Sequence, residues 1–385
     1  MKVRTVSSIY LKDAIELISG RDLPKTQFNS EGSGIPYIMG ASNIKDGVFK
    51  IERWTENPTV IGVQGDIILT VKGTVGEFFI QNEEEIHLSR QVMALRVKNG
   101  FINEYIKYFL AFYLTKLKEK AKGMIPGISR EDILMAELPN FDLEQQNTII
   151  KILKIAESLI SKRKVQLRAL SELQQSIFIE MFGDPSSNRF NLPKDILNNI
   201  TNKITDGEHQ NPIFESNGFP MVMAKNVLND EIDLINTAFI SEEDLKKFRK
   251  KCNPEKDDIL VVSRGATIGR ASVIKTDVDF ALMGSVILIK LNINDINPYF
   301  LKSLLNQQYY RNKLLSTSGS SAQQAIYLKD LKKLEILLPD INLQRKFAGV
   351  FNDIEEKKKL LEVSLDLLII NYRSLLQRLF KGELN

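Results

Sequence analysis

The chain has 385 residues, of which 43% are hydrophobic and 26% are charged, a balance typical of a folded globular protein. This length allows two or three domains. The single cysteine, Cys252, excludes an internal disulfide and a cysteine-based zinc site, and only two histidines argue against a histidine-rich metal centre, so we expect no metal. The net charge of +4 is compatible with binding to nucleic acid but does not single it out.

Neither a membrane span nor a signal peptide is expected. No apolar run approaches 18 residues, and the N-terminus, Met1-Lys2-Val3-Arg4, is not followed by the hydrophobic core of a signal peptide. We therefore expect a cytoplasmic protein.

Short strands are expected in the first part of the chain, separated by Gly and Asn residues. They are Ile35–Met39, Val60–Val63, Ile67–Val71, Glu77–Ile80 and Val92–Val97. Apolar residues at helical spacing predict a helix over Phe101–Lys120, and Ile133–Leu138 is expected to be a short strand that ends at Pro139. His87 follows three glutamates, so we expect it in a solvated loop.

A long helix is predicted over Leu143–Phe182, behind Asp142 as N-cap. Ten positions from Ile149 to Met181 step alternately by four and three residues, and eight of them are apolar. This spacing is typical of a helix that packs on another helix. At 1.5 Å per residue the helix would be about 60 Å long. The seam residues singled out here are Ile149, Leu153, Ile160, Leu167, Leu170 and Ile177.

The same pattern recurs at the end of the chain, from Phe347 to Leu379, with each position 198 residues after its counterpart. Its seam residues are Phe351, Ile354, Leu361, Leu365, Leu368, Tyr372 and Leu375, and Lys358 interrupts the second seam as Arg163 interrupts the first. The spacing leaves open whether these two cations set the register or extend outward. The two long helices are expected to pair in antiparallel fashion.

Other segments repeat in the same order, which indicates that the chain is a duplicated unit. The run from Gly218 to Met223 matches the run from Gly34 to Met39, Asp206-Gly207 matches Ser19-Gly20, and Arg264-Gly265 matches Lys72-Gly73. Gly183-Asp184-Pro185 breaks the first long helix and serves as a linker. We expect an α+β protein with a first globule over 1–140, a first long helix over 141–183, a second globule over 184–340 and a second long helix over 341–385. The antiparallel coiled coil of the helices would make the object pseudo-two-fold symmetric.

Motifs for catalysis are missing from the sequence. There is no GxxxxGK[ST] phosphate loop, no GxSxG nucleophile elbow and no GxGxxG after a strand. Asn297-Pro298-Tyr299 is similar to part of an amino-methyltransferase motif, but Pro in the first turn of a helix is an ordinary structural feature. We expect neither a catalytic residue nor a bound cofactor.

Polar and basic loops in equivalent places of the two halves are the candidate DNA contacts, because Lys and Arg bind phosphates while Asn, Gln and Arg can read base edges. In the first half the candidates are Arg21, Lys25, Asn43, Lys45, Lys72, Arg90, Gln91, Lys122 and Arg130. In the second half they are His209, Gln210, Lys225, Asn226, Arg264, Ser318, Ser320, Gln323 and Gln324. The basic run Lys246–Lys251 is expected to be a solvated helix face that Glu242, Glu243 and Asp244 balance.

The whole chain resembles the DNA-specificity subunits of type I restriction-modification enzymes. The half-length repeat carries this resemblance, together with Leu143-Glu144-Gln145-Gln146 after Pro139 and its weaker echo Leu343-Gln344-Arg345 after Pro339. Two further family-like runs are Thr205–Pro212, which is similar to an Asp-Gly-x-His loop, and Phe182-Gly183-Asp184-Pro185. The first half departs from the pattern, with Ser19-Gly20-Arg21 in place of that loop.

The resemblance implies two target-recognition domains that each read a few base pairs of double-stranded DNA, with the helix pair fixing the gap between the half-sites. It also implies two methyltransferase partner subunits, which would bind S-adenosylmethionine themselves, and in the full enzyme two translocating nuclease subunits. A coiled-coil scaffold that binds proteins and a stand-alone DNA-modifying enzyme are the alternative hypotheses. The scaffold would leave the duplicated polar loops without an explanation.

Overall fold

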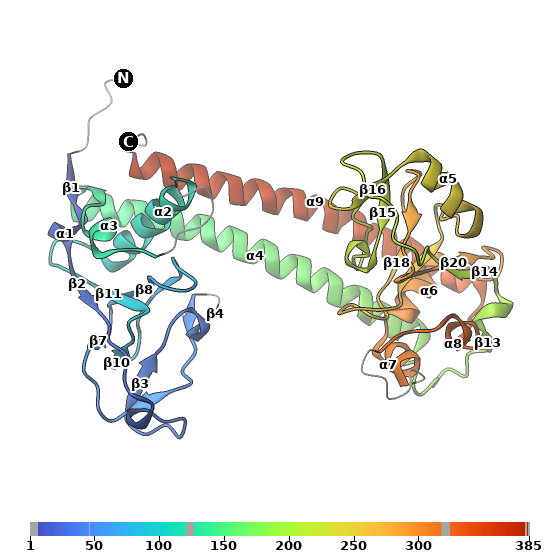
Figure 1. Ribbon diagram of the computed structural model, residues 1–385, viewed down its shortest axis with the longest axis horizontal. Coiled ribbons are helices and arrows are strands. Elements are labelled where there is room, and N and C mark those ends of the chain that lie inside the picture. The colour runs from blue at the N-terminus through green and yellow to red at the C-terminus, as the bar shows by residue number, and fades with distance from the viewer. Residues whose placement is uncertain (1–6, 46, 121–126, 317–323, 382, 384–385) are drawn as a thin grey trace. The chain divides into compact units, whose positions relative to one another are not determined.

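The computed structural model describes the chain except for residues 1–6, 46, 121–126, 317–323, 382 and 384–385 (Figure 1). The chain divides into two compact units. Unit 1 comprises residues 1–164 and 363–385, and unit 2 comprises residues 165–362. Each unit therefore contains one globule and one segment of each long helix, so every long helix belongs to both units.

The globule of unit 1 is built on two four-stranded sheets, ordered β2-β11-β8-β9 and β6-β3-β10-β7. The short pairs β1–β12 and β4–β5 complete it. The strands are β1 (Ser8–Tyr10), β2 (Ile15–Ser19), β3 (Ile35–Ile38), β4 (Ile44–Lys45), β5 (Val48–Phe49), β6 (Trp54–Thr55), β7 (Ile61–Val63), β8 (Ile67–Thr70), β9 (Phe78–Ile80), β10 (Glu85–Leu88), β11 (Val92–Val97) and β12 (Glu137–Pro139). The helical elements are α1 (Leu11–Ala14), η1 (Lys25–Gln27), η2 (Ala41–Asn43), α2 (Asn103–Lys120) and α3 (Arg130–Leu134).

The globule of unit 2 repeats this plan, with sheets ordered β14-β20-β17-β18 and β16-β15-β19 and the short pair β13–β21. Its strands are β13 (Lys194–Ile196), β14 (Thr201–Asp206), β15 (Phe219–Val222), β16 (Ala238–Ile240), β17 (Ile259–Val262), β18 (Ala271–Val273), β19 (Ala281–Leu282), β20 (Val286–Leu291) and β21 (Glu335–Leu337). Its helical elements are η3 (Leu197–Asn199), η4 (Ala224–Asn226), α5 (Glu242–Lys251), α6 (Pro298–Leu305), α7 (Gln308–Ser316) and α8 (Leu328–Lys332). The parallel pair β15–β19 corresponds to the parallel pair β3–β10. The prediction of a mixed fold built from two similar halves is confirmed.

The long helices are α4 (Leu143–Phe182) and α9 (Ile341–Phe380), each of 40 residues. Asp142 accepts a hydrogen bond from the amide of Gln145, as expected for an N-cap. In unit 1 the first turns of α4 share a core with Leu379 and Phe380, and farther along α4 Glu157 accepts a hydrogen bond from Tyr372. The residue numbers of the two helices change in opposite directions along the contact, so the two segments run antiparallel in this unit.

In unit 2 the helix segments also run antiparallel, since Gln174 contacts Glu355 while Phe182, farther along α4, packs on Phe347. In each unit the helix pair shares a hydrophobic core with one helix of the globule, α2 in unit 1 and α6 in unit 2. The predicted packing of the two long helices against each other is confirmed.

Two local predictions are wrong. His87 lies on β10 and is fully buried, with Nε2 2.9 Å from the carbonyl oxygen of Arg21, so it is not a loop residue. Burial lowers the pKa of its imidazole. The expected strand over Ile133–Leu138 begins instead as helix α3, because Ser129 and Asp132 form a capping box at its start, and β12 follows only at Glu137.

Candidate nucleic-acid interface

In the first globule a turn formed by Ser89, Arg90 and Gln91 joins the loops that carry most of the predicted contacts. Four backbone hydrogen bonds hold the surrounding segments to this turn or to each other. The amide of Ser89 donates to Ile38 O (3.0 Å), that of Val71 to Gln91 O (2.8 Å), that of Arg21 to Leu88 O (2.8 Å) and that of Ile128 to Val71 O (3.0 Å). These bonds bring the ends of β2, β3 and β8 and the segment before α3 together. We call Ser89–Gln91 the central turn of the first globule.

In the second globule Met283, Gly284 and Ser285 form the equivalent central turn. The same four bonds recur: the amide of Met283 to Val222 O (2.9 Å), Ser263 to Ser285 O (2.9 Å), Glu208 to Leu282 O (2.7 Å) and Ile326 to Ser263 O (2.9 Å). The two globules therefore hold corresponding loops in one backbone frame. By this frame Lys72 corresponds to Arg264, Arg21 to Glu208 and Gln91 to Ser285.

A glycine in each globule allows the first of these loops to approach. A Cβ at Gly20 would lie 2.0 Å from Ser89 O, and a Cβ at Gly207 would lie 2.1 Å from Leu282 O. Any side chain there would push the loop off the central turn. Backbone packing thus accounts for the sequence match between Ser19-Gly20 and Asp206-Gly207.

Several predicted contacts of the first globule are exposed beside the central turn. Arg21, Lys72 and Gln91 are exposed, as is Lys25 on η1. The predicted residue Arg90 is also exposed, and its Nε lies 2.8 Å from Oδ2 of Asp22.

The guanidinium of Arg130 is already engaged within the protein. It donates to Ser19 Oγ at 2.6 Å and to the carbonyl oxygen of Leu17 at 3.0 Å. A DNA contact from Arg130 would therefore compete with bonds that hold α3 to β2.

In the second globule His209, Lys225 and Arg264 are exposed. The ring of His209 is 2.7 Å from Asp206 Oδ2, and Lys251 lies 2.9 Å from the other oxygen of that carboxylate. Burial acts to raise the pKa of Asp206, but the hydrogen bonds from Lys251 and His209 outweigh it and lower the pKa. The carboxylate is therefore a charged anchor for the imidazole at neutral pH.

Two other predicted residues lie close to these in the chain or the fold. Gln324 is exposed and precedes Ala325, whose backbone pairs with that of Arg264. Gln210 is exposed beside His209, and its amide donates to Glu208.

The two predicted asparagines support the fold instead of facing a ligand. Asn43 and Asn226 are 2% and 1% exposed. Asn43 accepts from the amide of Met39 (2.9 Å), and Asn226 accepts from the amide of Met223 (3.1 Å). Each also donates its amide hydrogen to a carbonyl of the following loop, so neither side chain is free to read a base. We therefore leave both out of the interface.

Other predicted residues cannot be placed. Lys122, Ser318, Ser320 and Gln323 lie outside the described residues, and the side chain of Lys45 is not described either. Their contacts with DNA stay predictions.

Sequence reasoning missed Lys251 as part of this interface. The basic run was expected to be balanced by the acidic residues at the start of α5, and Lys246 does pair with Glu242 at 2.5 Å. Lys251, however, reaches Asp206 on β14, and Arg249 pairs with Asp279. Contacts between residues 45 positions apart leave no periodic signal in the sequence.

All thirteen seam residues of the long helices are buried or half-buried. Near the helix ends Phe178, Phe182 and Phe380 are also buried, because they belong to the hydrophobic cores that the helices share with the globules. Lys358 does not extend outward, since it is 6% exposed and contacts Asp230 and Glu355 at 3.0 Å each. Arg163 is half-buried.

Among the described residues no group of three or more His, Cys, Asp or Glu side chains is arranged to hold a metal ion. In the same part of the chain, no helix is both long and apolar enough to span a membrane.

A duplicated backbone frame that carries different side chains at equivalent places defines a class of protein built from two related modules in tandem. The family model described as the type I restriction modification DNA specificity domain matches residues 4–169 and again residues 194–365. The chain therefore belongs to this family, and its two halves are tandem specificity domains. Members of this family are specificity subunits, which are non-catalytic and provide DNA sequence specificity.

Individual relatives agree with this assignment. The chain is 23% identical to the specificity subunit of the type I restriction enzyme EcoBI from Escherichia coli, over 98% of this chain and 85% of that protein. It has the fold of a solved specificity subunit from M. genitalium, with a TM-score of 0.53, 18% identity and coverage of 99% and 98% of the two chains. A second structure, reported for complex assembly and conformational transition of a type I system, gives a TM-score of 0.64 at 16% identity over the whole of both chains.

Proposed function

We propose that each globule reads one half of a bipartite DNA target with the loops that meet at its central turn. The observation that carries this proposal is that four equivalent hydrogen bonds hold loops with different side chains, such as Arg21 against Glu208 and Gln91 against Ser285. A common frame with different exposed groups is what two readers of different sequences need, because base edges are distinguished by donor and acceptor pattern.

Lys72 and Arg264 are the proposed phosphate contacts common to both globules. Each follows the residue that hydrogen-bonds to the central turn, and each is exposed. A phosphate contact releases counterions, so each contact adds about one unit to the slope of log affinity against log salt. Lys72→Gln and Arg264→Gln should each reduce this slope by about one. Lys194→Gln, on β13, is the matched control and should leave the slope unchanged.

Gln324 is proposed to read a base in the second half-site, since glutamine can pair bidentately with adenine. Its neighbour Ala325 holds it beside Arg264. If the methylated motif were identical after Gln324→Ala, this role would be disproved.

We further propose that the chain recruits two adenine methyltransferase subunits, which carry the S-adenosylmethionine, and two nuclease subunits in the complete enzyme. Apolar side chains are exposed at positions of the two long helices that correspond by the repeat, which supports two equivalent docking sites for these subunits. Ile152 and Val350 are equivalent by the repeat and 36% and 37% exposed, and Val165 and Val363 are equivalent and 57% and 61% exposed. Because the proposed target is genomic DNA, we expect the complex to act in the cytoplasm.

The deciding experiment maps adenine methylation across a genome with and without this gene, in the presence of its partner subunits. We expect a split motif, two short specified sequences around an unspecified gap, that disappears when the gene is deleted. If the chain folds and binds its partners but deletion of the gene changes no methylated motif, the proposed function is refuted.

A further inference from the structure

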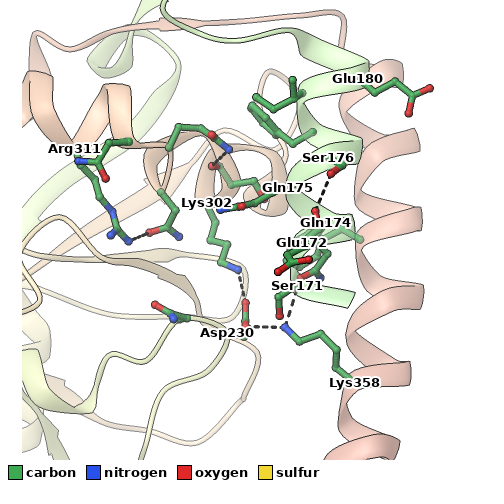
Figure 2. A pocket seen from close by; sticks show the side chains of 18 of the residues that line it. Ser171, Glu172, Gln174, Gln175, Ser176, Glu180, Asp230, Lys302, Arg311 and Lys358 are labelled. Atoms are coloured by element: carbon green, nitrogen blue, oxygen red, sulfur yellow. Dashed lines mark hydrogen bonds and ion pairs between the residues drawn. The ribbon is translucent and has the colours of Figure 1, made fainter. Parts of the chain in front are cut away.

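A cluster of buried and half-buried charges lies in unit 2, beside a cavity of about 1030 Å³ that α4, α6, α7 and α9 line (Figure 2). Asp230 is at its centre, with Lys302 of α6 at 2.6 Å from one carboxylate oxygen and Lys358 of α9 at 3.0 Å from the other. Glu355 joins Lys358 at 3.0 Å and accepts a hydrogen bond from Gln174 of α4 at 2.8 Å. The cluster therefore connects three helices.

Asp230 reaches this cluster from the tip of a tight hairpin. Val227 and Ile232 pair as a β-bridge, and the amide of Leu228 donates to Glu231 O at 3.0 Å. The hairpin follows η4 directly, and the carbonyl of Asn226 at its base accepts from the amide of Asp233 at 2.8 Å. Lys225, a proposed DNA contact, is thus one residue from a segment whose tip is attached to the helices.

Charge balance makes Asp230 the critical member of this attachment. Lys275, Lys302 and Lys358 face two carboxylates, Asp230 and Glu355. Among the described residues, Asp230 is the only carboxylate that contacts both Lys302 and Lys358, which are 7% and 6% exposed. Burial alone would raise the pKa of Asp230, but the two ammonium groups outweigh it and bring the pKa to about 2. Without this carboxylate the two buried lysines would repel each other.

Among the described residues of the first globule, no ion pair attaches the equivalent hairpin to the long helices. Glu157, 198 residues before Glu355, accepts hydrogen bonds from Tyr108 (2.8 Å) and Tyr372 (3.0 Å), and both donors lie on helices. The hairpin equivalent to Val227–Ile232 is formed by β4 and β5, where Val48 is 66% exposed and Phe49 stacks on Phe79 of the sheet. In the part of the chain that the structure describes, the hairpin clasp is therefore found in the second globule.

We propose that Asp230 is a positioning residue for DNA reading: by clasping the hairpin to α6 and α9, it holds Lys225 and the adjoining loop in the orientation that reads the second half-site. This inference rests on the proposed function. It adds that the accuracy of one half-site depends on the half-buried Asp230 and its two buried lysine partners. The two globules should consequently respond differently to loss of the carboxylate at the helix junction.

The test expresses each variant with its partner subunits in a host without the system and reads genomic adenine methylation by single-molecule sequencing. In Asp230→Asn the preference for the specified bases of one half-site should fall about tenfold, which is the size of a typical base discrimination. The other half-site should be read as in the wild type. The matched controls are Asp233→Asn, in the same loop but with its carboxylate hydrogen-bonded, among the described residues, only to Ile235 and Asn236, and Glu157→Gln in unit 1; neither control should change either half-site.

A double variant separates positioning from mere charge imbalance. Asp230→Asn with Lys302→Met removes one charge of each sign, and the apolar methionine can pack on the ring of Phe351, over which the Lys302 ammonium lies at 4.7 Å from the ring centre. We expect the double variant to fold and still to relax one half-site.

Three outcomes overturn the inference. Recovery of the full motif in the double variant, an unchanged motif in Asp230→Asn, or equal loss of both half-sites would each contradict it. A wild-type protein that yields no split motif would instead refute the proposed function itself, and this inference with it.

Discussion

Gln146 offers the sharpest test of how each globule is joined to its long helix. Its side chain is fully buried, accepts a hydrogen bond from the amide of Ile102 (2.9 Å) and donates to the carbonyls of Gly100 (3.0 Å) and Phe141 (2.9 Å). It therefore ties the first turn of α4 to the start of α2. Gln344 makes the equivalent three bonds at the start of α9, to Asn297, Asp295 and Pro339.

Gln146→Leu keeps the size of the side chain but removes the partner of the Ile102 N–H and of the Gly100 and Phe141 carbonyls. At about 1 kcal/mol for each hydrogen bond, unit 1 should lose about 3 kcal/mol of unfolding free energy. For a unit of this size the corresponding fall in Tm is roughly 6–12 °C.

Differential scanning calorimetry measures this effect, because the separate cores of the two units should give separate transitions. Gln146→Leu should lower one transition and Gln344→Leu the other. Gln145→Leu, an exposed neighbour with one hydrogen bond at the helix start, should cost less than about 1 kcal/mol and serves as the control. A loss below about 1 kcal/mol for Gln146→Leu, or an equal shift of both transitions by either variant, would refute the reasoning.

Three further predictions concern the spacer, the response to acid and a tight backbone contact. Deleting one heptad from each long helix, 162–168 and 360–366, keeps the apolar seam in register. Because seven residues rise about 10 Å, the gap in the recognised motif should shorten by about three base pairs. Methylome sequencing that shows an unchanged gap would exclude a spacer role. The pKa of Asp230 is lowered from 3.8 to about 2, so on acidification the Asp230 carboxylate of the unfolded chain is protonated before that of the folded chain. The stability that this group contributes is therefore complete above about pH 4 and is lost as the pH falls toward 2. The stability difference between wild type and Asp230→Asn, measured by urea unfolding, should therefore shrink across that window, and a constant difference would contradict the assignment. Gly207→Ala should destabilise unit 2 by several kcal/mol, because its Cβ would meet Leu282 O at 2.1 Å, and calorimetry that shows only a small effect would disprove the tight contact.

Much of the fold could be predicted because it rests on local periodicity. The apolar steps from Ile149 to Met181 and from Phe347 to Leu379 indicated two long helices that pack together, and the repeated Gly-x-Pro runs indicated duplicated globules. β10 was missed because its exposed start, Glu85, follows two other glutamates, while the buried residues Ile86 and His87 come only after it. Short strands of this kind are specified by their neighbours in the sheet more than by their own sequence.

The candidate site was predictable only in part. The sequence repeat located the loops correctly as equivalent places of two halves, and the repeat alone is enough to pair Lys72 with Arg264. Asn43 and Asn226, however, look the same in sequence whether they read a base or cap a turn. Only burial, at 2% and 1% exposure, assigns them to the fold.

The sequence by itself determined that this protein is a tandem repeat with two long pairing helices and no catalytic motif, because helical periodicity and internal repetition are properties of the chain alone. The tertiary structure alone decided which polar side chains are free. It brought Ser285 to Ser263, Lys251 to Asp206 and Asp230 to Lys358 across 22, 45 and 128 residues. Such contacts follow from the packing of whole elements, and no local spacing records them. For that reason the family and its DNA-specificity role could be anticipated from the chain, whereas the hairpin clasp of the second globule could not.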